Sequence, residues 1–156
     1  MRKDSAISDS RRSLAKSLNE TPSANRIHIG FYGKRNSGKS SLINAFTGQQ
    51  VAIVSDVAGT TTDPVYKAME VHGIGPCVFI DTAGVDDVGE LGKMRVEKTE
   101  KAAEKTDIAV LLFSGEEYSA ELEWFRYFKE KHTPILCVLS KADTLTGSDA
   151  IAAQLK

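Results

Sequence analysis

The chain has 156 residues, of which 41% are hydrophobic, and its formal net charge is −1. A chain of this length corresponds to one domain with a core of its own, and the near-neutral charge argues against a dedicated nucleic-acid binder. No apolar run approaches the roughly 20 residues that span a membrane, and the charged N-terminus lacks the apolar segment of a secretory signal. We therefore expect a cytoplasmic protein with no nucleic-acid and no membrane partner.

The expected secondary structure begins after a polar N-terminal segment. Residues 1–25 show no sustained apolar periodicity, which predicts a flexible arm, and residues 26–156 form the expected domain. Strands are expected at 27–32, 65–71, 77–81, 108–113 and 135–139. A first helix is expected to end at Thr47, because Gly48 follows it. Further helices are expected at 93–105 and 117–131, and another one starts at 149.

This alternation of strands and helices predicts an α/β fold. The short connection between strands 65–71 and 77–81 makes them an antiparallel pair, whereas the other strands are separated by helices and should run parallel. The expected architecture is a three-layer phosphate-loop NTPase, in which helices cover both faces of a mixed, mostly parallel sheet. Ligands of such sheets bind at the carboxyl ends of the strands.

Two cysteines, Cys77 and Cys137, lie in apolar strand-like runs without a Cys or His partner at metal-ligand spacing. They are expected to be small buried hydrophobic residues. The sequence therefore contains no ligand set for an iron–sulfur cluster.

Residues 33–40 form a complete G-x-x-x-x-G-K-S phosphate loop between the first strand and the first helix. In such a loop, backbone N–H groups surround a phosphate, and Lys39 adds a positive charge for the β- and γ-phosphates. The Ser40 hydroxyl is a ligand for Mg²⁺. The residues expected to bind the nucleotide here are Asn36, Ser37, Gly38, Lys39, Ser40 and Ser41.

Two further segments are suited to Mg²⁺ and to the γ-phosphate. Asp81-Thr82-Ala83-Gly84 ends a strand, so that Asp81 can hold Mg²⁺ through a water and the Gly84 N–H can reach the γ-phosphate. The polar segment 59–63 contains Thr61, whose hydroxyl is expected to bind Mg²⁺ only while the γ-phosphate is present. Both segments predict a conformational switch that responds to the loss of the γ-phosphate on nucleotide hydrolysis.

The last strand is followed by Ser140-Lys141-Ala142-Asp143, a segment that is expected to select the base of the nucleotide. Asp143 can accept two hydrogen bonds from guanine, a donor pair that adenine lacks, and the stem of Lys141 can cover the purine ring. The pattern resembles the guanine motif N-K-x-D, with Ser140 in place of the usual Asn. The Ser140 hydroxyl can still bond the backbone of the phosphate loop. The sequence predicts GTP rather than ATP.

Together these motifs resemble the TrmE–Era–EngA–YihA–Septin-like branch of GTPases, which includes MnmE, Era and Der and has the Ras-like G-domain fold. Within it, residues 21–30, 54–70 and 79–87 resemble HydF, the GTPase scaffold of [FeFe]-hydrogenase maturation. This resemblance implies a GTP-hydrolysing switch whose partners are hydrogenase maturation proteins and hydrogenase, reached through the full-length protein. It leaves a dimer of G domains open. Because the sequence stops soon after Asp143, we expect a GTPase domain shortened at its C-terminus, without the cluster-binding and dimerisation domains.

The resemblance also implies stimulation by K⁺. Asn36 and the carbonyl groups of Ser55 and Val57 match the positions that hold a monovalent cation in the MnmE-like branch. The alternative is that Asn36 only braces the loop by hydrogen bonding to its backbone.

Val85 occupies the position of a water-orienting glutamine, so intrinsic turnover should be slow unless another group stabilises the charge of the transition state. The expected catalytic residues are Lys39, Thr61, Gly84 and Asn36.

Two other functions fit the same motifs. One is an MnmE- or Era-like GTPase that serves tRNA modification or ribosome assembly. The other is a nucleotide-binding interaction module without useful turnover, which the absence of the glutamine favours.

Overall fold

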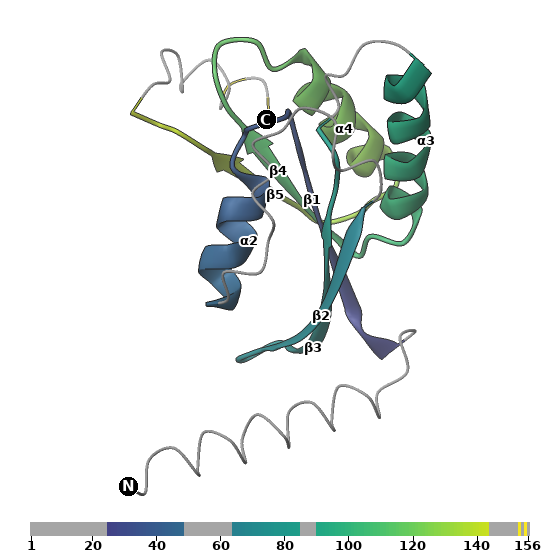
Figure 1. Cartoon of the computed structure of the whole chain (residues 1–156), viewed down its shortest axis with the longest axis vertical. Helices are drawn as coiled ribbons and strands as arrows, with labels where there is room; N and C mark the ends of the chain where they lie inside the picture. Colours follow the sequence, from purple (N-terminus) through teal and green to yellow (C-terminus); the bar gives the residue numbers. More distant parts are fainter. Residues whose placement is uncertain (1–24, 49–63, 85–89, 144–152, 154, 156) are drawn as a thin grey trace, which may run out of the picture.

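A five-stranded sheet lies at the centre of the computed structural model (Figure 1). The elements are β1 (Ile27–Gly33), α2 (Lys39–Thr47), β2 (Val65–Val71), β3 (Gly75–Asp81), α3 (Glu90–Glu104), β4 (Ile108–Phe113), α4 (Ser119–Glu130) and β5 (Ile135–Leu139). The structure describes residues 25–48, 64–84, 90–143, 153 and 155. The expected N-terminal arm, the segment 59–63 and nearly all of the last expected helix therefore lie outside the described residues.

The strand order is β2-β3-β1-β4-β5, and only β2 runs antiparallel to its neighbour. β2 and β3 form a hairpin whose turn is closed by a hydrogen bond from the Ile74 N–H to the Val71 carbonyl, 3.0 Å. β4 follows α3 and β5 follows α4, and the pairs β1–β3, β1–β4 and β4–β5 are all parallel. The predicted α/β fold with a mixed, mostly parallel sheet is confirmed.

The starts of two helices differ from the sequence-based expectation, and their ends fall one residue earlier. α3 begins at Glu90 rather than at residue 93 and includes Gly92 in its first turn, because one glycine weakens a helix but does not end it. α4 begins at Ser119 rather than at residue 117. The Glu117 carboxylate instead accepts the Ser119 N–H at 2.9 Å, which places Glu117 ahead of the helix.

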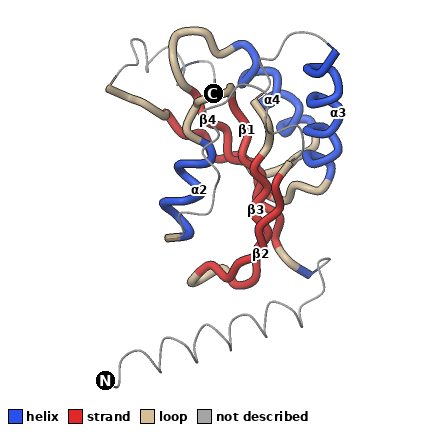
Figure 2. The backbone as a smooth tube through the Cα atoms, in the orientation of Figure 1, coloured by secondary structure: helices blue, strands red, loops and turns tan. Residues whose placement is uncertain are grey.

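Helices cover both faces of the sheet. Figure 2 shows α2 on one side of the strands and α3 with α4 on the other. Because side chains alternate across a strand, Phe31 faces the α2 side while Tyr32 faces α4. The buried cluster on the α2 side contains Ile29, Phe31, Ile43, Cys77, Phe79, Val110 and Leu112. The cluster on the other side contains Tyr32, Ala103, Ala109, Leu111, Phe113, Trp124 and Phe128.

The aromatic residues of α4 pack on the sheet. Trp124 and Phe128 are buried, and Phe125 packs at the edge of the same cluster. Cys77 is buried and Cys137 is half-buried. None of the helices in the described ranges is both long enough and apolar enough to cross a membrane.

Tyr32 joins β1 to both helices on its face of the sheet. Its ring lies 5.1 Å from that of Trp124 and 4.9 Å from that of Phe128, centroid to centroid. The buried Thr106 hydroxyl donates to the Ala102 carbonyl at 3.0 Å, so the Tyr32 hydroxyl donates to the Thr106 oxygen at 2.6 Å. Burial raises the pKa of Tyr32, which keeps this phenol a hydrogen-bond donor.

The substitution Tyr32→Phe should lower the free energy of unfolding by about 1–2 kcal/mol, because it removes the buried hydrogen bond and leaves the ring in place. Urea denaturation measures this change. Tyr66→Phe is the matched control, since Tyr66 is exposed on β2. Equal effects of the two substitutions would contradict the assigned role of the Tyr32 hydroxyl.

Candidate functional site

The phosphate loop connects the carboxyl end of β1 with the N-terminus of α2. Gly38 is the N-cap of α2 in the left-handed conformation, φ 94° and ψ 13°, and provides no side-chain cap. A side chain is rarely tolerated in that conformation, so the glycine sets the shape of the loop. The first N–H groups of a helix without a side-chain cap favour an anion. The structure therefore agrees with a phosphate site at this point.

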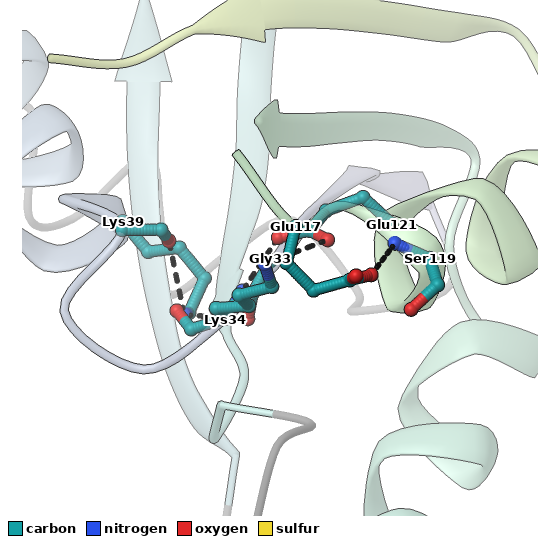
Figure 3. Close-up of polar contacts among 7 residues, drawn as sticks. Gly33, Lys34, Lys39, Glu117, Ser119 and Glu121 are labelled. Atoms are coloured by element: carbon teal, nitrogen blue, oxygen red, sulfur yellow. Dashed lines mark hydrogen bonds and ion pairs between the residues drawn. The ribbon is translucent and has the colours of Figure 1, made fainter. Parts of the chain in front are cut away.

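Lys39 is buried at the centre of the loop. Its ammonium group donates to the carbonyl oxygens of Gly33 at 2.8 Å and Lys34 at 2.5 Å (Figure 3). The Ser37 hydroxyl lies 3.4 Å from the same group and is itself fully buried. A buried ammonium needs such acceptors, and the loop supplies them from its own backbone.

Ser40 and Asp81, two of the expected Mg²⁺ ligands, are in direct contact. The Ser40 hydroxyl donates to the Asp81 carboxylate at 2.6 Å. Burial raises the pKa of Asp81, while the hydrogen bond from Ser40 and the charges of Lys39 and Lys67 oppose this increase. A hydroxyl and a carboxylate side by side match the oxygen ligands that Mg²⁺ prefers. The third expected ligand, Thr61, lies outside the described residues.

The segment after β3 packs directly on the phosphate loop. The buried Thr82 hydroxyl donates to the Phe31 carbonyl at 2.6 Å and so fixes this segment to β1. A Cβ atom on Gly84 would lie 2.6 Å from the Arg35 Cα, which leaves no room for any side chain. Gly84 therefore lies against the backbone of the phosphate loop.

The expected guanine segment is tied to the phosphate loop by Ser140. Its hydroxyl donates to the Ser37 carbonyl at 2.5 Å, which confirms that a serine can make this bond, and its N–H donates to the Phe113 carbonyl at 2.8 Å. Lys141 and Asp143 follow and are exposed, with Lys141 in the left-handed conformation at φ 54°.

Asn36 and Ser41 lie on the exposed side of the site. Asn36 has φ 57°, a conformation that asparagine tolerates better than most residues, and Ser41 is an exposed residue of α2. The other two residues of the expected K⁺ site, Ser55 and Val57, lie outside the described residues, as does Val85. The structure thus brings together Lys39, Ser40, Asp81, Gly84 and the Ser140 segment.

One residue of this region was not predicted from the sequence. Glu121 of α4 is fully buried, and its carboxylate accepts the Lys34 N–H at 3.3 Å. A signal was present, because Glu121 lies three residues before Trp124 and seven before Phe128, on the apolar face of the helix. A carboxylate at such a position needs a polar partner inside the protein.

Sequence comparisons place this chain among known GTPases. Residues 28–141 match the profile of a family described as 50S ribosome-binding GTPase. The GTPase Der of Wolinella succinogenes is 47% identical over 98 residues, which cover 61% of this chain and 20% of Der. The tRNA modification GTPase MnmE of a Synechococcus species is 37% identical over 129 residues, which cover 80% of this chain and 27% of MnmE. The chain thus spans only about a quarter of these relatives.

Comparison with solved structures also finds GTPases. Era of Aquifex aeolicus bound to GDP·AlF4− is 26% identical with a TM-score of 0.66, over 82% of this chain and 44% of that chain. Era in complex with MgGDPNP and nucleotides 1506–1542 of 16S ribosomal RNA matches with the same identity, TM-score and coverage. These comparisons support the branch that contains MnmE, Era and Der, and they do not distinguish HydF within it.

The substitution Ser140→Ala should weaken nucleotide affinity about fivefold, because the loss of one hydrogen bond, about 1 kcal/mol, uncouples the Ser140 segment from the phosphate loop. Titration with a fluorescent GDP analogue measures this affinity. Ser119→Ala, which removes an exposed hydroxyl from α4, is the control and should bind as the unmodified chain does. Unchanged affinity in Ser140→Ala would show that this bond does not support binding.

Proposed function

The chain belongs to the 50S ribosome-binding GTPase family, and on this premise we propose that it is a GTP-hydrolysing switch domain within a larger protein. The proposal depends on one observation, which is that three motifs meet at the carboxyl ends of the strands. The Lys39 ammonium lies inside the loop, Ser40 at the end of the loop bonds to Asp81 after β3, and Ser140 attaches the proposed base-selecting segment to the loop.

Each group has a defined task in this proposal. Lys39 and the N–H groups of residues 36–41 bind the phosphates, and Asp143 accepts hydrogen bonds from guanine. Ser40 and Asp81, together with Thr61, would hold Mg²⁺, whose charge counters that of the phosphates when it is bound. The direct contact of Ser40 with Asp81 supports this assignment.

The switch itself would act through Gly84. Because Gly84 packs against Arg35 of the phosphate loop, a γ-phosphate bound to the loop changes the space available to the segment after β3. Segment 59–63 would respond to the same phosphate through Thr61. Hydrolysis would then release both segments, which is how a GTPase changes its affinity for partners.

The partner class favoured by the relatives is RNA. MnmE is a tRNA modification GTPase, and Era is seen in complex with 16S ribosomal RNA. These findings count against the expectation that no nucleic acid takes part. The net charge of −1, on which that expectation was based, describes only this domain, whereas the relatives are several times longer. We propose a role of the MnmE or Era type, in tRNA modification or ribosome assembly.

A second candidate is the GTPase domain of a HydF-like scaffold. The residue runs 21–30, 54–70 and 79–87 favour it, and its partners would be hydrogenase maturation proteins and hydrogenase. Affinity purification of the full-length protein from its own cells distinguishes the two roles. Enrichment of tRNA or ribosomal RNA supports the first, and enrichment of hydrogenase maturation proteins without RNA supports the second.

The substitution Asp143→Asn should lower GTP affinity at least about tenfold and shift preference toward xanthosine triphosphate, because the amide can donate to the 2-oxo group of xanthine. Competition binding measures the preference, and retained xanthosine triphosphate binding shows that the variant is folded. Equal competition by ATP and GTP in the unmodified chain would contradict the guanine assignment. Turnover no faster than that of Lys39→Ala would favour the interaction module without hydrolysis.

Hydrolysis should be about tenfold faster in KCl than in NaCl, because a K⁺ ion held by Asn36, Ser55 and Val57 would counter charge that develops on the phosphates. Asn36→Gly should abolish the difference, since glycine accepts the φ of 57° but carries no oxygen ligand. Equal rates in the two salts, or stimulation that survives this substitution, would leave Asn36 as a brace of the loop.

A further inference from the structure

A buried carboxylate lies directly behind the phosphate loop. Glu121, in the first turn of α4, is 0% exposed. Its Oε1 atom accepts the Lys34 N–H at 3.3 Å, and its Oε2 atom lies 4.0 Å from the Lys34 ammonium (Figure 3). In the part of the chain that the structure describes, Oε2 has no hydrogen-bond partner. Such a group is costly to bury.

Packing alone does not account for a carboxylate at this position. The same helix face carries Trp124 and Phe128 in the aromatic cluster, and an apolar side chain of similar length would fill the space without a desolvation penalty. Burial raises the pKa of Glu121, while the charges of Lys34 and Lys39 oppose this increase. The charged groups that act on the carboxylate thus belong to the phosphate loop.

Lys34 is held from both sides. Its N–H group points to Glu121, and its carbonyl oxygen accepts the Lys39 ammonium at 2.5 Å and the Ser37 N–H at 3.3 Å. Each backbone group of Lys34 faces a charge of the favourable sign, because the N–H faces the Glu121 carboxylate and the carbonyl faces the Lys39 ammonium. Residue 34 therefore connects Glu121 to Lys39 through its two backbone hydrogen bonds.

We propose that Glu121 is a positioning residue for GTP hydrolysis, which through Lys34 holds the Lys39 ammonium in the direction that the β- and γ-phosphates require. The inference rests on the proposed GTPase function. Its physical basis is that the rate of hydrolysis can fall up to roughly a hundredfold when a catalytic group is displaced by about 1 Å. α4 supplies a rigid base for this arrangement, because its next two turns are anchored in the aromatic cluster.

The test compares three variants of the chain in single-turnover hydrolysis at saturating GTP. Glu121→Met removes the acceptor and the charge at nearly constant length and should lower the rate about tenfold or more. Glu121→Gln keeps an acceptor oxygen and should lose only about threefold, since a neutral hydrogen bond is weaker than a charge-assisted one. Glu123→Gln is the matched control, because it removes an exposed carboxylate from the same helix and should leave the rate unchanged.

A second measurement separates positioning from stability. The ratio of GTP affinity to GDP affinity should fall in Glu121→Met, because Lys39 meets the β-phosphate of both nucleotides but the γ-phosphate of GTP alone. Partial unfolding would lower both affinities equally and leave the ratio unchanged. If Glu121→Met does not fold, Glu121→Gln decides by the same two measurements.

Two outcomes overturn the proposal. One is a hydrolysis rate in Glu121→Met within about twofold of that of the unmodified chain. The other is a rate loss with an unchanged ratio of affinities, which would make Glu121 a purely structural residue. Failure of the GTPase function itself would look different, because the unmodified chain would then hydrolyse GTP no faster than Lys39→Ala.

Discussion

The buried ammonium group of Lys39 is the constraint on which the rest of the site depends. A cation inside the protein is stable only if acceptors surround it, and here the carbonyl oxygens of Gly33 and Lys34 point inward to provide them. These inward carbonyl groups, together with the left-handed conformation of Gly38, give the loop its shape. The loop is therefore organised around its own lysine in the structure described here.

The loop has no regular hydrogen-bond ladder of its own, so neighbouring segments hold it in place. Ser140 binds the Ser37 carbonyl, Glu121 binds the Lys34 N–H, and Gly84 packs against Arg35. These contacts come from the end of β5, from α4 and from the end of β3. Each supports the residues around Lys39, and each connects the loop to a different part of the domain. This arrangement connects the phosphate loop both to the Ser140 segment and to the segment after β3, for which we propose base selection and switching.

Sequence reasoning predicted most of the fold, because strong local signals agreed with the tertiary structure. The bounds of β4 and β5 were predicted to the residue, and the hairpin of β2 and β3 followed from the short connection between these strands. The starts of α3 and α4 were wrong by a few residues, since helix ends depend on single contacts such as that of Glu117 with Ser119. The signature motifs predicted the GTPase family, because each motif keeps its chemistry within a few consecutive residues. The choice between relatives inside the family has no such local signal.

The sequence by itself determined the class of fold, the GTPase family and the phosphate-loop motif, and it named the groups that we propose to bind a nucleotide. Only the tertiary structure decided how these groups support one another. Ser140 and Ser37 are 103 residues apart, and Glu121 and Lys34 are 87 apart, so neither contact follows from periodicity or spacing. Helical spacing places Glu121 on the apolar face of α4, but its partner Lys34 depends on how that face is oriented toward the loop. That orientation is fixed by the packing of Trp124 and Phe128 against Tyr32, which is a property of the whole core.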